Sequence, residues 1–228
     1  MRKGNVTKKV AVIGLGGFGE NLVKTLSEKK NIEIIAIDLD QVLVNRIKDF
    51  ASRAISMDAT VKENLAAAGI DEVDYAVVSS GPGLESSIIT VHSLKELGVP
   101  HIIAKALNSE HEKILHLVGA TGVVFPERDS AEKVGNQIHI PNLIDYIPLP
   151  SGYVIQEIKP PAAFVGKTLA EIDLRKNFKV TVLAIKSVSP KLNTLNPSAN
   201  ARISANDVLI VFGEVNDIEN LDETMNHS

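Results

Sequence analysis

A glycine-rich turn, Gly14-Leu15-Gly16-Gly17-Phe18-Gly19, follows a short apolar run and precedes a segment with helical spacing. The apolar run at residues 10–13 is typical of a strand that is buried on both faces of a parallel sheet. In a G-x-G-x-x-G pattern, the first glycine permits the tight turn, the second lets a pyrophosphate approach, and the third packs the helix on the strand. The turn therefore predicts a Rossmann-type nucleotide-binding domain, although the bare pattern also fits a glycine turn that binds nothing.

The residues around this turn alternate between short apolar runs and helical patterns. Strands are predicted at residues 10–13, 34–37, 53–56, 74–78, 101–104 and 123–125. The segments between them carry apolar residues at helical spacing, and three of these segments stop at Gly69, Gly98 and Gly119. Six strands alternating with five helices predict an α/β fold, a Rossmann-like doubly wound parallel sheet.

The second half of the chain predicts a smaller module. A helix is predicted from Glu127 to Ile138, and prolines at 141, 148 and 150 then indicate a linker. Strand-like segments at 153–158, 180–185 and 207–212, a short helix at 168–172 and a loop at 191–199 predict an α+β module. The last stretch, 214–228, carries five acids and no lysine or arginine, which indicates a solvated helix or a frayed tail. The expected boundaries are 7–127 for the nucleotide-binding domain, 128–147 for a crossover helix and linker, 148–214 for the module and 215–228 for the acidic tail.

Composition excludes several classes of protein. No apolar run reaches the roughly 20 residues that cross a bilayer. The absence of cysteine excludes disulfides, thiolate metal sites and cysteine nucleophiles, and with the lack of a signal-peptide core it predicts a cytoplasmic protein. A net charge of −4, 4% aromatic residues and no tryptophan argue against a nucleic-acid partner.

Asp38 closes the second predicted strand, 19 residues after Gly19. A carboxylate at this place can accept hydrogen bonds from both ribose hydroxyls, and it repels a 2′-phosphate, which disfavours NADP. As an alternative, Asp38 caps the helix that begins near Asp40. The position favours the ribose role.

Further polar residues follow the carboxyl ends of strands, where ligands of open α/β sheets bind. Ser79-Ser80-Gly81 ends the fourth strand, and Asp58-Ala59-Thr60 follows the third, where the base of a nucleotide is expected. Asp58 can equally cap the helix that begins at Val61. Lys105 follows the fifth strand and either reaches a phosphate as a point charge or is a solvated surface lysine.

The sequence contains no constellation for dehydrogenase chemistry, which needs a proton donor and a substrate pocket. None of the histidines is placed with a partner acid: His92, His101, His111, His116, His139 and His227. No P-loop, zincin or nucleophile-elbow pattern is present, and the second module is small for a substrate domain. We therefore interpret the nucleotide as a signal and the chain as a non-enzyme, with a small NAD-dependent oxidoreductase as the alternative.

Several stretches, in the right order, resemble the RCK or KTN family (TrkA-N plus TrkA-C), the regulatory gating-ring domains of potassium channels and transporters. In the first domain the resemblance is carried by residues 9–19, 38–40, 58–60, 65–70, 74–78, 94–100 and 125–127. In the second it is carried by residues 166–175, 182–185 and 207–213. The chain is most similar to a stand-alone regulatory subunit of Trk/Ktr-type potassium uptake systems.

The resemblance implies a regulatory subunit on the cytoplasmic face of the cell membrane, docked on a potassium-transporting pore subunit. It implies a homo-dimer that assembles into a homo-octameric ring, and it implies binding of ATP and ADP or of NAD and NADH. The implied nucleotide contacts are Gly14, Leu15, Gly16, Gly17, Phe18, Gly19, Asp38, Asp58, Ala59, Thr60, Ser80, Gly81 and Lys105.

Two positions bear on which ligands the family resemblance implies. Glu127 matches a glutamate that binds divalent cations near the dimer interface in Ktr-type members, while its alternative is a first-turn acid favoured by the helix dipole. Gly17 stands where ATP-regulated members commonly have an arginine that reaches the terminal phosphate. Glycine has no side chain for this contact. The resemblance therefore does not decide between ATP and ADP, and NAD is an alternative ligand.

In some relatives the C-terminal module binds cyclic di-AMP at its dimer interface. The corresponding stretch of this chain contains Thr168, Leu174, Arg175 and Phe178. The sequence does not bring these residues into one pocket, and the favoured alternative for Arg175 is a surface ion pair with Asp173 or Glu171.

Overall fold

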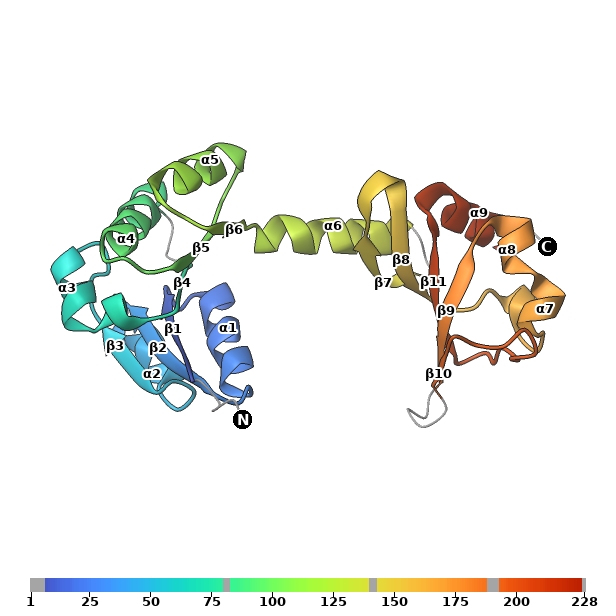
Figure 1. Cartoon of the computed structure of the whole chain (residues 1–228), viewed down its shortest axis with the longest axis horizontal. Coiled ribbons are helices and arrows are strands. Elements are labelled where there is room, and N and C mark those ends of the chain that lie inside the picture. The colour runs from blue at the N-terminus through green and yellow to red at the C-terminus, as the bar shows by residue number, and fades with distance from the viewer. Residues whose placement is uncertain (1–6, 80–82, 140–142, 188–192, 227–228) are drawn as a thin grey trace, which may run out of the picture. The chain divides into compact units, whose positions relative to one another are not determined.

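The structure, a computed structural model, describes residues 7–79, 83–139, 143–187 and 193–226 (Figure 1). The chain divides into two compact units, Met1–Arg128 and Asp129–Ser228. Helix α6 (Pro126–His139) crosses this boundary. Among the described helices, none is both long and apolar enough to span a membrane.

The first unit is a six-stranded parallel sheet in the order β3-β2-β1-β4-β5-β6. Its strands are β1 (Lys8–Ile13), β2 (Ile32–Asp38), β3 (Arg53–Ser56), β4 (Tyr75–Val78), β5 (His101–Lys105) and β6 (Gly122–Val124). Its helices are α1 (Gly17–Ser27), α2 (Gln41–Ile47), α3 (Lys62–Ala67), α4 (Leu84–Glu96) and α5 (Ser109–Val118), with a 3₁₀ turn, η1 (Ile70–Glu72). The strand order reverses between β1 and β4, so the predicted Rossmann-like fold is confirmed and its switch point lies beside the glycine turn.

Helices cover both faces of this sheet because alternate residues of each strand point to opposite sides. Ala11 and Ile13 of β1 pack in one cluster with residues of α3, α4 and α5, while Val10 and Val12 pack in a second cluster with α1 and α2. Figure 1 shows the same division, with α1 and α2 on one side of the sheet. The continuous apolar runs in the sequence therefore reflect burial on both faces.

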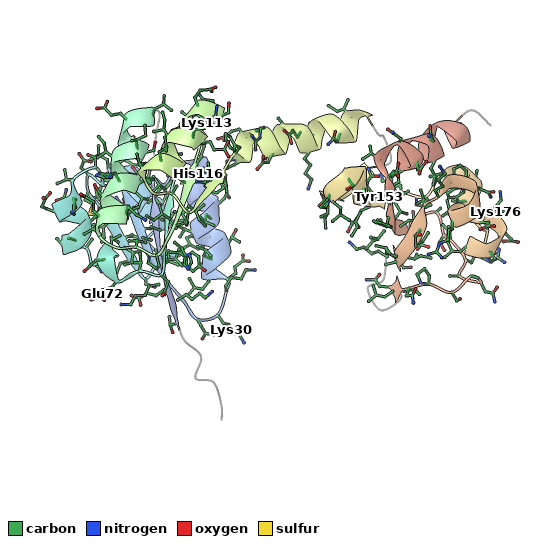
Figure 2. All side chains as sticks on the ribbon, turned by 45° about the horizontal axis from the view of Figure 1, so that its top comes forward. Lys30, Glu72, Lys113, His116, Tyr153 and Lys176 are labelled. Carbon is green, nitrogen blue, oxygen red and sulfur yellow. The ribbon has the colours of Figure 1, made fainter. Side chains whose placement is uncertain are left out.

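The second unit is a five-stranded antiparallel sheet in the order β10-β9-β11-β8-β7. The strands are β7 (Leu143–Pro148), β8 (Tyr153–Ile158), β9 (Thr181–Lys186), β10 (Thr194–Leu195) and β11 (Val208–Glu214). The helical segments are η2 (Pro150–Gly152), η3 (Ala162–Phe164), α7 (Leu169–Ile172), α8 (Leu174–Phe178) and α9 (Val215–Asn226). Tyr153, labelled in Figure 2, stacks on Phe212 with the ring centroids 5.4 Å apart.

Four elements of this unit differ from the expectation. Residues 143–147, expected as linker, belong to β7, an edge strand of the sheet, where a proline such as Pro148 is tolerated. The expected loop contains β10, the opposite edge strand, and α8 follows α7 without having been predicted. The acidic tail is a helix, but it is not solvated all round, since Ile218 and Leu221 are only 1% exposed in the core. Pro141 and Lys191 lie outside the described residues.

Candidate nucleotide-binding site

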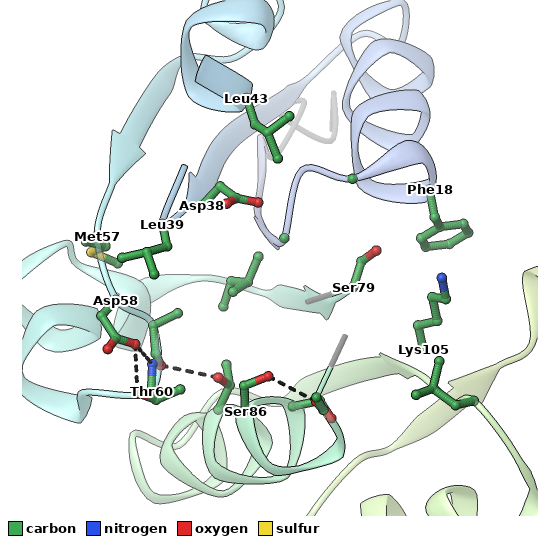
Figure 3. Close-up of a pocket in the computed structure, with 18 of the residues that line it drawn as sticks. Phe18, Asp38, Leu39, Leu43, Met57, Asp58, Thr60, Ser79, Ser86 and Lys105 are labelled. Carbon is green, nitrogen blue, oxygen red and sulfur yellow. Dashed lines mark hydrogen bonds between the residues drawn. The ribbon is translucent and has the colours of Figure 1, made fainter. Parts of the chain in front are cut away.

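A cavity of about 580 Å³ opens in the first unit at the carboxyl ends of β1, β2 and β4 (Figure 3). A volume of this size fits the 300–1,000 Å³ that is common for small-molecule sites. Its lining comes from four segments: the glycine turn, the end of β2, residues 57–60, and the α4–α5 side. In Figure 3, Asp38 and Asp58 lie toward one end of the cavity and Phe18 and Lys105 toward the other.

Two glycines of the turn are required by the backbone. Gly14 has a φ of 92°, a conformation that residues with a Cβ rarely adopt. A Cβ at Gly19 would lie 1.9 Å from the carbonyl oxygen of Gly14, so only glycine lets α1 pack this closely on the turn. These two residues therefore shape the turn, as their places in the motif predict.

The start of α1 lies at the cavity without a side-chain cap. Gly16 is the N-cap of α1 and makes no side-chain cap, and a Cβ at Gly16 or Gly17 would meet no atom within 4 Å. Gly14, Gly16, Gly17 and Phe18 line the cavity, whereas Leu15 is buried in the core. The N–H groups and positive dipole end of α1 can therefore face a phosphate.

Asp38 links the end of β2 to the glycine turn. Its Oδ2 accepts a hydrogen bond from the Leu15 N–H at 2.6 Å, and its Oδ1 accepts one from the Asp40 N–H at 2.8 Å. The N-cap of α2 is Asp40, whose Oδ1 accepts from the Val42 N–H at 2.7 Å, so Asp38 does not cap this helix. Each carboxylate oxygen can accept a second hydrogen bond, and Asp38 lines the cavity.

Asp58 makes a local turn at the same end of the cavity. Its Oδ1 accepts hydrogen bonds from the Thr60 N–H at 2.9 Å and the Thr60 hydroxyl at 2.7 Å. These bonds lower the pKa of Asp58. The N-cap of α3 is Val61, without a side-chain cap, so the alternative in which Asp58 caps α3 is wrong. Asp58, Ala59 and Thr60 line the cavity together with Leu39 and Met57, which offer apolar surface to a flat base.

Lys105 lies at the other end of the cavity, where its side chain extends toward Phe18 (Figure 3). Its Nζ forms an ion pair with Glu127 in the first turn of α6. The Lys105 side chain is only 20% exposed, so the alternative of a solvated surface lysine is wrong. The hydrogen bond from Lys105 lowers the pKa of Glu127 and keeps its carboxylate charged.

Sequence reasoning missed one wall of the cavity, formed by α4 and α5. Ser87 and Thr90 line it from one face of α4, and His111 lines it from α5. His111 is 2% exposed, with its Nε2 3.0 Å from the Ser87 hydroxyl oxygen, while its Nδ1 accepts from the Leu107 N–H at 3.3 Å. The i, i+3 spacing of Ser87 and Thr90 was the available signal.

The described histidines form no acid–base constellation in the cavity. Burial lowers the pKa of His111, which favours the neutral ring, and its polar partners are a hydroxyl and a backbone N–H. His92 does have an acidic neighbour, Glu96 at 3.7 Å, but both side chains are exposed on α4 outside the cavity. His116, labelled on α5 in Figure 2, contacts the Ala120 carbonyl oxygen at 3.2 Å.

The other residues predicted to bind a metal or the nucleotide do not all lie at the cavity. Within the described ranges no group of three or more histidines and acids is placed to hold a metal ion, and Glu127 forms an ion pair with Lys105. Ser80, Gly81 and His227 lie outside the described residues, whereas Ser79 lines the cavity.

In the second unit, Leu174 and Arg175 line a hollow of about 320 Å³. Thr168 forms a capping box with Glu171, and Phe178 packs edge-on against Phe164. Among the described contacts, no ion pair joins Arg175 to Asp173 or Glu171, so the expected surface pair is wrong. Of the four residues in the predicted cyclic di-AMP stretch, Thr168 and Phe178 are not among those that line this hollow.

Two domain families match the chain in sequence. The TrkA-N domain family matches residues 10–126, and the TrkA-C domain family matches residues 154–226. The chain is 37% identical to the Ktr system potassium uptake protein C of Bacillus subtilis (strain 168), over 97% of this chain and 99% of that relative. It is 32% identical to the Ktr system potassium uptake protein A of the same organism, over 93% and 94% of the two chains.

Solved structures share the fold. The crystal structure of the GsuK RCK domain matches with a TM-score of 0.54 at 23% identity, over 97% of this chain and 47% of that one. The GsuK channel bound to NAD matches with a TM-score of 0.52 at 23% identity, over 97% and 39%. The TrkA-N domain of the inner membrane protein ybaL from Escherichia coli matches with a TM-score of 0.52 at 20% identity, over 58% and 98%. The chain thus spans about half the length of the GsuK RCK chain that it matches.

Proposed function

Since the chain belongs to the family defined by the TrkA-N and TrkA-C domains, we propose that it is a non-enzymatic regulatory subunit that controls a potassium-transporting membrane protein in response to a nucleotide. The two relatives from Bacillus subtilis are potassium uptake proteins of the Ktr system, and the similarity covers nearly the whole of each chain. The proposed place of action is the cytoplasmic face of the membrane, on a separate pore subunit.

One observation carries the nucleotide part of the proposal. The cavity places the uncapped N-terminus of α1, the Asp38 carboxylate and the Lys105 ammonium around one space. These three groups are complementary to the parts of an adenine nucleotide: phosphates for the helix end and the lysine, and ribose hydroxyls for the carboxylate.

The proposed ligand is an adenine nucleotide without a 2′-phosphate, either ATP and ADP or NAD and NADH. Asp38 would repel a 2′-phosphate, which argues against NADP. Gly17 offers open space but no side chain to a terminal phosphate, so both classes of ligand stay in the proposal. NAD is the ligand of the GsuK channel structure whose fold this chain shares.

A signalling role requires that the nucleotide binds two states of the assembly with different affinity, since a ligand shifts an equilibrium only by that difference. The proposed assembly is a homo-dimer that forms a homo-octameric ring. Ile114 and Leu117 support contacts between copies, because they lie one turn apart on α5 and are 41% and 85% exposed.

Cyclic di-AMP is proposed as a second ligand, at the C-terminal module. The support is the family resemblance together with the hollow that Leu174 and Arg175 line. A binding titration of the chain with cyclic di-AMP and of its Arg175→Ala variant tests this site separately from the nucleotide cavity.

The deciding experiment for the nucleotide is calorimetric titration of the purified chain with ATP, ADP, NAD and NADH, with the mass followed by light scattering. We expect submicromolar to micromolar binding of at least one of the four, which would supply about 8 kcal/mol or more of binding free energy. If none of the four binds, the nucleotide-sensing proposal is wrong. Turnover of NADH with a small carbonyl substrate would instead support the alternative, a small NAD-dependent oxidoreductase.

A further inference from the structure

Lys105 is the cation that the cavity offers to an anionic ligand. Of the described residues that line the cavity, it is the one lysine or arginine, and the other charged groups there are the acids Asp38 and Asp58. A phosphate therefore finds two attractive partners, the N-terminus of α1 and the Lys105 ammonium.

The Lys105 ammonium already forms an ion pair with Glu127. The two side chains form a hydrogen-bonded ion pair across 22 residues of sequence, and Glu127 itself is not among the described residues lining the cavity. The Glu127 carboxylate and a phosphate are both anionic acceptors for the same lysine N–H groups. The two anions therefore compete for Lys105.

The surroundings favour transfer of Lys105 from the carboxylate to a phosphate. The Glu127 side chain is 68% exposed, so water can replace the lysine as its partner. It also lies in the first turn of α6, where the helix dipole stabilises a negative charge without any cation. Lys105 is 20% exposed and is attracted more strongly by a phosphate, which carries more charge than a carboxylate.

We propose that Glu127 sets how strongly the cavity prefers phosphorylated nucleotides, by competing with the phosphate for Lys105. The inference rests on the proposed function, because it concerns the same cavity. It assigns Glu127 the role of a specificity-determining residue that acts through Lys105. Binding of a phosphate would also remove the cationic partner from the first turn of α6, the helix that crosses the boundary between the two units.

The proposal predicts that a change at Glu127 affects ligands with phosphate and leaves a ligand without phosphate unaffected. In Glu127→Gln the lysine is no longer held by a charged partner, so ADP and ATP should bind about two- to fivefold more tightly, the range expected for a partly exposed ion pair. Adenosine, which has no phosphate, should bind with unchanged affinity. The gain should shrink at high salt, because exposed charges are screened.

The measurement is calorimetric titration with adenosine, AMP, ADP and ATP in the presence of EDTA, which removes any contribution of a divalent cation. Glu63→Gln is the matched control, because Glu63 is also an exposed acid in the first turn of a helix, α3, and lies outside the cavity. It makes the same change of net charge and should leave all four affinities unchanged.

The double variant Lys105→Gln/Glu127→Gln separates this mechanism from a general effect of charge. If Glu127 acts through Lys105, the gain for ADP and ATP should be absent when Lys105 is already replaced. A gain that persists in the Lys105→Gln background overturns the proposal, and so does weaker or unchanged ATP binding in Glu127→Gln alone. A wild-type chain that binds NAD or NADH but none of these four ligands also overturns the proposal, whereas a chain that binds none of the six contradicts the proposed function instead.

Discussion

Single residues determine which part of a nucleotide each end of the cavity can contact. Asp38 has two tasks, because both of its carboxylate oxygens hold backbone N–H groups, of Leu15 and Asp40, while the same side chain lines the cavity. The carboxylate thus fixes the glycine turn, and its remaining acceptor sites lie where the ribose is proposed to bind. Removing the carboxylate should lower both the stability of the turn and the affinity for a nucleotide. A test therefore needs a measurement that responds to the ribose contact alone.

We expect Asp38→Ala to weaken ATP, ADP and NAD alike, by about tenfold or more, since each hydrogen bond to a charged acceptor contributes about 1.5–3 kcal/mol. The specific readout is the preference for ATP over 2′-deoxy-ATP, measured by calorimetry. Wild-type protein should prefer the ribonucleotide, and Asp38→Ala should lose that preference. Asp40→Ala serves as control, because it removes a helix cap beside the site but keeps the Asp38 carboxylate. A preference that survives in Asp38→Ala would reject the ribose assignment.

At the scale of elements, His111 joins two helices and a loop. It lies in the first turn of α5, contacts Ser87 of α4 and accepts from the Leu107 N–H in the loop that follows β5. Asn108 caps α5 by accepting from the His111 N–H at 2.8 Å. Lys105 is the last residue of β5 and lies two residues before Leu107, so the histidine helps to hold the cationic end of the cavity.

Burial lowers the pKa of His111 below its usual value of about 6.5, so the unfolded chain binds a proton more readily than the folded one. Stability should therefore be fully present above pH 6.5 and should decline as the pH falls from there through the lower folded-state pKa. We expect urea unfolding to show this decline between pH 7.5 and 5.5 in wild type. The decline should be smaller in His111→Gln and should persist in His92→Gln, which removes an exposed histidine. An equal decline in all three proteins would contradict this role of burial.

Local sequence patterns predict the strands and helices of the first unit better than those of the second. The parallel sheet was predicted because its strands are continuous apolar runs separated by glycine turns. In the second unit β7 contains Asp145 and Pro148, and β10 has only two residues. Both are edge strands that form because β8 and β9 provide partners. The acids of α9 predict a solvated helix or a frayed tail, whereas Ile218 and Leu221 are buried because the folded sheet provides a surface for them.

At the scale of the whole molecule, each unit has a core of its own. One unit is built on clusters that cover both faces of the parallel sheet, and the other on a cluster around Phe164, Ile203 and Leu209. The exposed apolar residues of α5 belong to neither core. Such side chains are common sites of contact between protein chains.

We expect Leu117→Glu to lower the assembled mass measured by light scattering, because burying a carboxylate in an apolar contact costs several kcal/mol. Since Leu117 does not line the cavity, nucleotide affinity per chain should stay within about twofold of wild type. Glu112→Gln, which removes a charge on the opposite side of the same helix, five positions before Leu117, is the control and should leave the mass unchanged. An unchanged mass in Leu117→Glu would exclude this face of α5 from the assembly contact.

The sequence alone determined the strands and turns of the first unit and the family, because these depend on residues close together in the chain. The G-x-G-x-x-G pattern already required glycine at Gly14 and Gly19, and the structure gives the reason, a positive φ and a 1.9 Å approach. Only the tertiary structure decided that Lys105 pairs with Glu127 and His111 with Ser87, which lie 22 and 24 residues apart. Such pairs depend on strand order and helix packing, which bring distant residues together in ways that local spacing does not encode.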